Sequence, residues 1–412
     1  MRIIESGNRR AVEALAARDA ARSPRVAREA ARIVRDVRTR GDRALIEWTR
    51  KLDNPKYARV APLSRAALER GWADTPASVR QALNVAANNL EQVATAQVPR
   101  PFTVRVAPGH RIEQRVQPLN RVGCYVPAGR HPLPSTLLMT AIPARVAGVR
   151  EIVVVCPRPA PVVLAAALEA GVTEVFAIGG AQAVGALAYG TRSIRRVDKI
   201  VGPGNAWVAA AKALVSADCA IDLHAGPSEI VVDSDHGRAQ WIAADLIAQA
   251  EHDPAARAIF VTTKRALAAA VAREVAARVP ATGPAAEALA TNGAIIVCPT
   301  RADAILTVNR LAPEHLVVDS ADNLDQYRAA GTIFVGGWSV QAAGDYCTGS
   351  NHVLPTGGAA RFRGGLSAAD FVRVFSVQTL NERAIKAIGP SVVALAEAEG
   401  LTAHAASVKV RL

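Results

Sequence analysis

Residues Glu151 to Ile178 read EIVVVCPRPAPVVLAAALEAGVTEVFAI. The apolar runs Glu151–Cys156 and Glu174–Ile178 have the length of buried strands, and the alanine-rich stretch Val162–Ala170 between them predicts a helix. A strand, a helix and a second strand in this order form a βαβ unit, in which both strands are parallel members of one sheet.

The alternation of strands and helices continues on both sides of this unit and restarts near residue 229. Further strand-like runs occur at Gly123–Val126, Asp198–Val201, Ile230–Val232, Ala258–Thr262, Ala294–Val297, His315–Val318 and Thr332–Val335. The helical stretches in the first half are Ser135–Gly148, Ala181–Tyr189 and Ala206–Ala217. Because the pattern starts twice, it predicts two α/β modules, each built on a mainly parallel sheet.

Helical segments flank the two modules. Apolar spacing predicts helices at Val26–Arg40, from Asp42 through Lys51 and at Ser78–Ala96, before two strand-like runs at 103–107 and 111–116. After Gly336 a glycine-rich loop extends to about Leu366, and loops of that length are usually functional. Helices are expected at 368–399. The fold class is therefore α/β, with two Rossmann-like, mainly parallel-sheet modules and helical N-terminal and C-terminal extensions.

Composition restricts the classes of function. The chain of 412 residues carries a net charge of +13, but its arginines are spread along helices and only 4% of its residues are aromatic, so we expect no nucleic-acid partner. No apolar run is long enough to span a bilayer, and the charged N-terminus has no signal-peptide core, so we expect no membrane association. The five cysteines form no C-x-x-C pair. A cytoplasmic enzyme fits best.

Gln249 and His252 close a helix that begins near Gln240. Residues three apart lie on one face of a helix, so an amide oxygen and an imidazole nitrogen can reach one point there. These donors suit a borderline divalent cation such as zinc, which would need further ligands from elsewhere in the chain. The alternative is a solvated polar helix end.

Glu314 and His315 combine a carboxylate with an imidazole, the two groups best suited to acid–base chemistry near neutral pH. In a regular strand their side chains would point to opposite faces. They can therefore serve one site only if the backbone just before the strand is irregular.

Glycine-rich turns follow several predicted strands, where α/β sheets bind ligands. They are Val122-Gly-Cys-Tyr125-Val-Pro-Ala-Gly129, Gly179-Gly-Ala-Gln182 and Val201-Gly-Pro-Gly-Asn205. None completes G-x-G-x-x-G, so the spacing alone does not predict a dinucleotide. Each could equally be an ordinary turn between a strand and a helix.

Taken together, the polar motifs resemble the histidinol dehydrogenase family in order along nearly the whole chain. They are Gln249-Ala-Glu-His252-Asp, Ala312-Pro-Glu-His-Leu, Gly344-Asp-Tyr, Asn351-His-Val-Leu-Pro-Thr, the tail Ala-Glu-Gly-Leu-Thr-Ala-His404, Ile178-Gly-Gly-Ala-Gln-Ala, Lys199-Ile-Val-Gly-Pro-Gly-Asn and Ala225-Gly-Pro-Ser-Glu. The motifs are long and independent of each other. The resemblance implies NAD-dependent oxidation of L-histidinol through the aldehyde to L-histidine.

The resemblance also implies roles for individual residues. Glu314 and His315 would be the catalytic pair, with His315 as general base and Glu314 activating water. The zinc ligands would be Gln249, His252, Asp345 and His404, and the NAD contacts would be Tyr125, Gln182 and Asn205. The substrate contacts would be Ser228, Gln249, His252, His315, Asp345, His352, Glu399 and His404.

The implied domain organisation follows from these roles. Residues 1–25 would be an N-terminal extension, 26–118 and 229–366 a discontinuous module carrying the metal and catalytic residues, and 119–228 the NAD-binding module. Residues 367–412 would form a helical tail that reaches the partner subunit's site in a homodimer. Two alternatives stay open, namely a relative that oxidises a different polyol, amino alcohol or sulfonated diol, and a basic binding protein without activity.

Overall fold

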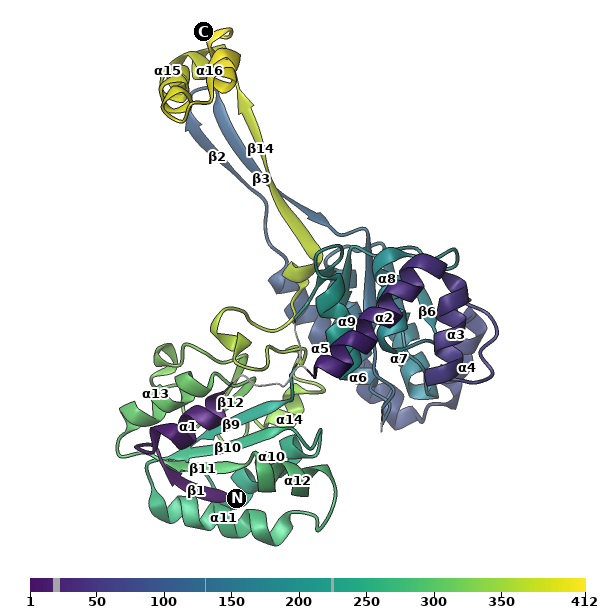
Figure 1. The fold of residues 1–412 in the computed structure, drawn as a ribbon. Coiled ribbons are helices and arrows are strands. Elements are labelled where there is room, and N and C mark those ends of the chain that lie inside the picture. Colours follow the sequence, from purple (N-terminus) through teal and green to yellow (C-terminus); the bar gives the residue numbers. More distant parts are fainter. Residues whose placement is uncertain (18–22, 130, 224–225) are drawn as a thin grey trace.

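A computed structural model of the chain describes residues 1–17, 23–129, 131–223 and 226–412. Two α/β modules lie side by side, and a long arm projects away from them (Figure 1). The N-terminus lies in one module and the C-terminus at the tip of the arm. Among the described residues no helix is both long and apolar enough to cross a bilayer.

One module contains a six-stranded sheet in the order β1-β11-β10-β9-β12-β13, with every pair of neighbours parallel. The strands are β1 (Arg2–Glu5), β9 (Glu229–Asp233), β10 (Arg257–Thr262), β11 (Ala294–Val297), β12 (His315–Val318) and β13 (Thr332–Val335). Two separate hydrophobic clusters form its core. One includes residues of α10 (Ala239–Ala250), α11 (Arg265–Arg278) and α12 (Pro284–Thr291), and the other includes residues of α1 (Arg9–Ala16) and α13 (Arg301–Leu311).

The other module contains a five-stranded parallel sheet in the order β6-β5-β4-β7-β8. Its strands are β4 (Arg121–Tyr125), β5 (Glu151–Val155), β6 (Glu174–Phe176), β7 (Lys199–Val201) and β8 (Ala220–Ile221). The helices that connect them are α6 (Pro134–Val146), α7 (Pro161–Ala170), α8 (Gly180–Tyr189) and α9 (Ala206–Val215). The two predicted parallel-sheet modules are therefore confirmed, with strand bounds within a few residues of those expected.

The N-terminal helices correct the expected division of the chain. Residues 26–118 were expected to join 229–366, but α2 (Pro24–Arg40) packs on α8 and α9, α3 (Asp42–Leu52) on α8, α4 (Arg65–Asp74) on α7, and α5 (Ala77–Gln97) on α6. Their apolar faces thus complete the core of the five-stranded module. The N-terminal extension 1–25 also differs from expectation, because β1 pairs in parallel with β11 as an edge strand of the six-stranded sheet. Residues 18–22 lie outside the described part.

The arm is a three-stranded antiparallel sheet of β2 (Phe102–Ala107), β3 (His110–Pro118) and β14 (Val372–Leu380), tipped by α15 (Glu382–Ala398) and α16 (Thr402–Lys409) (Figure 1). The expectation of helix throughout 368–399 is therefore wrong for residues 372–380. The sequence Val-Arg-Val-Phe-Ser-Val-Gln-Thr-Leu alternates in the manner of a strand, and β14 pairs with β3 over nine positions. The arm exposes many apolar side chains, among them Phe102, Val104, Val106, Val374 and Leu395.

Candidate active site

Glu314 and His315 lie at the start of β12, and the backbone before them is irregular. Ala312 adopts a left-handed conformation with φ of 50°, which is uncommon for a residue other than glycine, and β12 begins only at His315. This irregularity lets both side chains face one another, with His315 Nδ1 3.6 Å from Glu314 Oε2. Both residues are buried. The backbone before the strand is therefore irregular, as is required if Glu314 and His315 are to serve one site.

The main chain of Glu229, at the start of the neighbouring strand β9, holds both side chains. Its amide donates to Glu314 Oε2 at 2.9 Å, and its carbonyl oxygen lies 3.1 Å from His315 Nδ1. Because a carbonyl oxygen can only accept, Nδ1 carries the proton of the neutral ring. The lone pair of His315 is then on Nε2, which lies 3.5 Å from Asp345 Oδ1.

The surroundings shift the pKa values of this pair. Burial raises the pKa of Glu314. Burial alone would lower the pKa of His315, but the carboxylates of Glu314 and Asp345 act in the opposite direction and raise it. His315 is therefore a stronger base than a free histidine.

His252 and Asp345 come together beside His315, and Gln249 precedes His252 by three residues at the end of α10. Gln249 is completely buried at the end of α10, and both its amide oxygen and its amide nitrogen have no hydrogen-bond partner. The helix ends at Ala250, so His252 lies in the turn that follows it, with Nε2 3.9 Å from Asp345 Oδ2. A fully buried amide without a partner is costly unless something binds it. Its oxygen, the imidazole and the carboxylate are the donors that zinc accepts, so the residues present fit such an ion.

One chain supplies only part of such a ligand set. No cluster of three or more histidine, cysteine, aspartate or glutamate side chains with metal-site geometry occurs in the ranges the structure covers. The remaining residues that the resemblance implies, Glu399 and His404, are exposed in the segment of α15 and α16. That segment lies at the far end of the arm from α10 and α14 (Gln341–Gly344) (Figure 1). Within one chain they do not meet the other predicted ligands.

The long loop after Gly336 joins the two modules. His352 Nδ1 lies 3.0 Å from the carbonyl oxygen of Asp345, and its Nε2 lies 3.0 Å from the hydroxyl of Thr136 in α6. Both ring nitrogens are therefore bonded within the chain, and contact of His352 with a substrate remains a prediction. Ser228 donates a side-chain hydrogen bond to Glu314, which places it beside the predicted catalytic pair. Ala225, which opens its motif, lies outside the described residues.

The residues predicted to bind a cofactor lie at the carboxyl edge of the five-stranded sheet. The hydroxyl of Tyr125, at the end of β4, accepts from the amide of Gly180 at 3.0 Å. Gln182, in the first turn of α8, is completely buried. Asn205 is exposed and caps α9 by accepting from the amides of Trp207 and Val208. The three predicted residues thus follow three strands that lie close together in one sheet.

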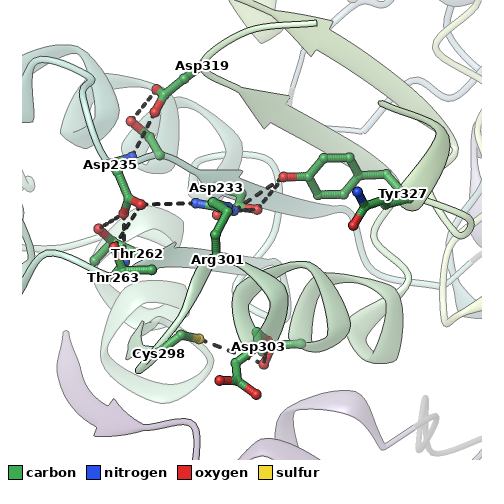
Figure 2. A network of polar contacts seen from close by, with 12 residues as sticks. Asp233, Asp235, Thr262, Thr263, Cys298, Arg301, Asp303, Asp319 and Tyr327 are labelled. Carbon is green, nitrogen blue, oxygen red and sulfur yellow. Dashed lines mark hydrogen bonds and ion pairs between the residues drawn. The ribbon is translucent and has the colours of Figure 1, made fainter. Parts of the chain in front are cut away.

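At the carboxyl edge of the six-stranded sheet, polar side chains bind one another (Figure 2). The guanidinium of Arg301 pairs with Asp233 at the end of β9 and with Asp235 just beyond it. Tyr327 donates to Asp233 at 2.7 Å, while Asp235 also accepts from the hydroxyls of Thr262 and Thr263. Most of these groups bind one another, although Asp233 Oδ1 is buried without a hydrogen-bond partner, and the residues predicted to bind the cofactor lie at the carboxyl edge of the five-stranded sheet instead.

Sequence reasoning missed three residues of these sites. Glu229 holds the predicted catalytic pair through its main chain, Gln341 donates to Asp345 Oδ2 at 2.6 Å, and Asp53 accepts from Gln182 Nε2 at 2.8 Å. Glu229 directly follows Ser228 in the motif Ala225-Gly-Pro-Ser-Glu, of which the resemblance implies a role for Ser228 only. Gln341 stands four residues before Asp345, a spacing that could have indicated a contact within one helical turn. No sequence signal connects Asp53 with Gln182.

Comparisons with known proteins show the family to which the sequence and the fold are similar. A sequence model described as histidinol dehydrogenase matches residues 16–412. Histidinol dehydrogenase of Caulobacter vibrioides is 46% identical over 390 residues, covering 92% of this chain and 91% of that protein. Histidinol dehydrogenase of Aromatoleum aromaticum is 44% identical over 414 residues, covering 97% and 94%. The crystal structure of histidinol dehydrogenase from Elizabethkingia anophelis superposes with a TM-score of 0.92 at 32% identity, covering 97% of this chain and 95% of that one.

Proposed function

This chain belongs to the histidinol dehydrogenase family, and we propose that it oxidises L-histidinol to L-histidine through L-histidinal while two NAD are reduced, the last steps of histidine biosynthesis. The observation that carries the proposal is the placement of the buried acid–imidazole pair beside the carboxylate of Asp345, which His252 also approaches. The enzyme would be an oxidoreductase acting on a CH–OH group.

His315 would act as the general base in the first oxidation. Its Nδ1–H is held by the carbonyl of Glu229, so Nε2 is the atom that takes the proton of the substrate hydroxyl. NAD, when bound, accepts the hydride that leaves the same carbon. The raised pKa of His315 favours this proton transfer.

Glu314 would serve the second oxidation, which converts the aldehyde to the acid. An aldehyde must gain water before a second hydride can leave, and Glu314 would take a proton from that water. Its carboxylate is held by the amide of Glu229 and by Ser228, so one oxygen atom keeps a fixed position. Burial raises the pKa of this carboxyl, which makes it a better proton acceptor than an exposed glutamate.

Zinc would be held by Gln249, His252 and Asp345 of one chain and by His404 of the partner subunit. A zinc ion there would orient the amino and imidazole nitrogens of the substrate, since zinc has no redox chemistry of its own. Ser228, His315, His352 and Glu399 of these two chains would complete the substrate contacts. NAD would lie at the edge formed by Tyr125, Gln182 and Asn205.

The arm supports a homodimer with shared sites. It carries Glu399 and His404 far from the other ligands, and its strands and helices expose apolar side chains. A second subunit that packs on these side chains would bury them, and the exchange of arms would bring each tail to the other subunit's site. The five cysteines are all free, which agrees with a reducing compartment such as the cytoplasm.

The reaction is tested by its stoichiometry. Purified protein supplied with L-histidinol and NAD should form two NADH for each histidinol consumed, with histidine as the product. A single NADH for each molecule of a different alcohol would favour another substrate. A failure to turn over any alcohol, with zinc supplied, would refute the proposal.

A further inference from the structure

Asp53 lies at the carboxyl edge of the five-stranded sheet, although it belongs to the N-terminal helices. It is the residue that ends α3, and its Oδ2 accepts a hydrogen bond of 2.8 Å from Gln182 Nε2. The backbone of Gly179, at the end of the same strand-to-helix turn, also donates to it. Asp53 is close enough to influence the ionisation of Tyr125. Its carboxylate therefore shares the edge with two of the residues predicted to bind NAD.

Asp53 is more accessible than those two residues. Tyr125 is 4% exposed and Gln182 is 0% exposed, and the polar contacts described for them join them to Gly180 and to Asp53. Asp53 is only half-buried. A ligand that lies against this edge can therefore contact the carboxylate of Asp53 more readily than the buried amide of Gln182.

The chemistry of this carboxylate restricts what the edge can bind. It lies at the N-terminus of α8, where a phosphate would otherwise be favoured, and it would repel a second anion, although the positive charge of Arg158 also acts on it and partly offsets this repulsion. A carboxylate accepts about four hydrogen bonds, and two of these are supplied by Gln182 and Gly179. Hydroxyl groups suit the remaining positions. The amide oxygen of Gln182 is buried and has no hydrogen-bond partner, so it offers no accessible acceptor at this edge.

We propose that Asp53 binds the ribose hydroxyls of the adenosine half of NAD and thereby selects NAD over NADP. This inference rests on the proposed function, because it takes NAD as the ligand of this edge. The 2′-phosphate of NADP would bring negative charge to the carboxylate and remove a hydroxyl that could donate to it. Asp53 is thus a determinant of cofactor specificity.

The test compares Asp53→Asn with the original protein in steady-state oxidation of L-histidinol. Asparagine keeps the shape of the side chain and removes its charge. We expect the KM for NAD to rise about tenfold, and the preference for NAD over NADP in kcat/KM to fall at least about tenfold, since the charge that repels the 2′-phosphate of NADP is removed. Asp74→Asn is the matched control, because Asp74 is exposed at the end of α4 and should leave both values unchanged.

Two further measurements keep the inference separate from folding and from the proposed function. Asp53→Glu keeps the charge but displaces it, so it should weaken NAD binding and still reject NADP, even if Asp53→Asn folds poorly. Calorimetric titration of NAD and NADP into the protein without histidinol measures the preference whether or not histidinol is the substrate. An unchanged NAD affinity and preference in a folded Asp53→Asn protein, or equal binding of NAD and NADP by the original protein, would overturn the inference.

Discussion

The carbonyl oxygen of Glu229 lies 3.1 Å from Nδ1 of His315 and fixes the proton of the neutral ring on that nitrogen. The amide of the same residue donates to Glu314. One residue of β9 therefore sets the orientation of both side chains proposed to be catalytic, Glu314 just before β12 and His315 at its start. This contact crosses between neighbouring parallel strands, so the geometry of Glu314 and His315 depends on the register of the sheet as well as on their own backbone.

The separate roles of Glu314 and His315 predict different products for two variants. Glu314→Gln should still form the first NADH in a single turnover and then stall, because the water that the second oxidation needs is no longer activated. His315→Asn should slow the first NADH by about a hundredfold to ten-thousandfold, which is the usual contribution of a general base. Rapid-mixing absorbance measures both phases. His236→Asn, at an exposed histidine, is the control. Equal loss of both phases in Glu314→Gln would contradict the separation of roles.

The side chain of Glu229 predicts a pH-dependent stability. Burial raises its pKa from 4.5 to about 7, although Arg257 at 3.6 Å acts in the opposite direction. The folded state therefore binds this proton more tightly than the unfolded state. The stability from the protonated carboxyl is fully present below pH 4.5 and is lost as the pH rises through 7. Glutamine does not titrate, so Glu229→Gln should remove this loss of stability. Between pH 4.5 and 7 the free energy of unfolding of the variant should therefore fall less than that of the original protein.

Urea unfolding at a series of pH values measures this difference. Asp74→Asn serves again as a control, because an exposed carboxyl should leave the pH dependence as it is. If Glu229→Gln and the original protein lose the same free energy between pH 4.5 and 7, Glu229 does not titrate as its burial implies.

Gln341 predicts an effect on metal affinity through Asp345. Its amide nitrogen donates to Asp345 Oδ2 at 2.6 Å, and Gln341 itself is buried, so the carboxylate is held in one orientation. Gln341→Ala should weaken zinc binding about tenfold to a hundredfold, as the loss of a group that orients a ligand usually does. Competition with a chelating dye measures the affinity without any turnover. Gln81→Ala, on the exposed surface of α5, should bind zinc normally, and an equally normal Gln341→Ala would refute the role of Gln341.

The extent to which the sequence predicts this structure differs between its parts. The buried strands and the helices between them follow from local periodicity, which depends only on neighbouring residues. Helices 24–97 were assigned to the wrong module because the partner of an apolar helix face is a long-range choice. The strand at 372–380 alternates as a strand should, but its neighbours in the arm lie more than 250 residues away. The contacts of Glu229 and Asp53 arise in the same way, from segments that only the fold brings together.

The placement of His404 at the tip of the arm predicts that two inactive variants restore each other. If each site takes its catalytic pair from one subunit and His404 from the other, a dimer of a His315→Asn chain and a His404→Asn chain has one intact site. Co-expression of the two chains should then recover about a quarter of the original activity, since half of randomly paired dimers are mixed. His315→Asn with Glu314→Gln is the matched control. Glu314 and His315 belong to the same subunit's part of each site. Every site of a mixed dimer therefore keeps one of the two substitutions, and no activity should return. If the first pair also stays inactive while both chains dimerise, His404 does not act across subunits.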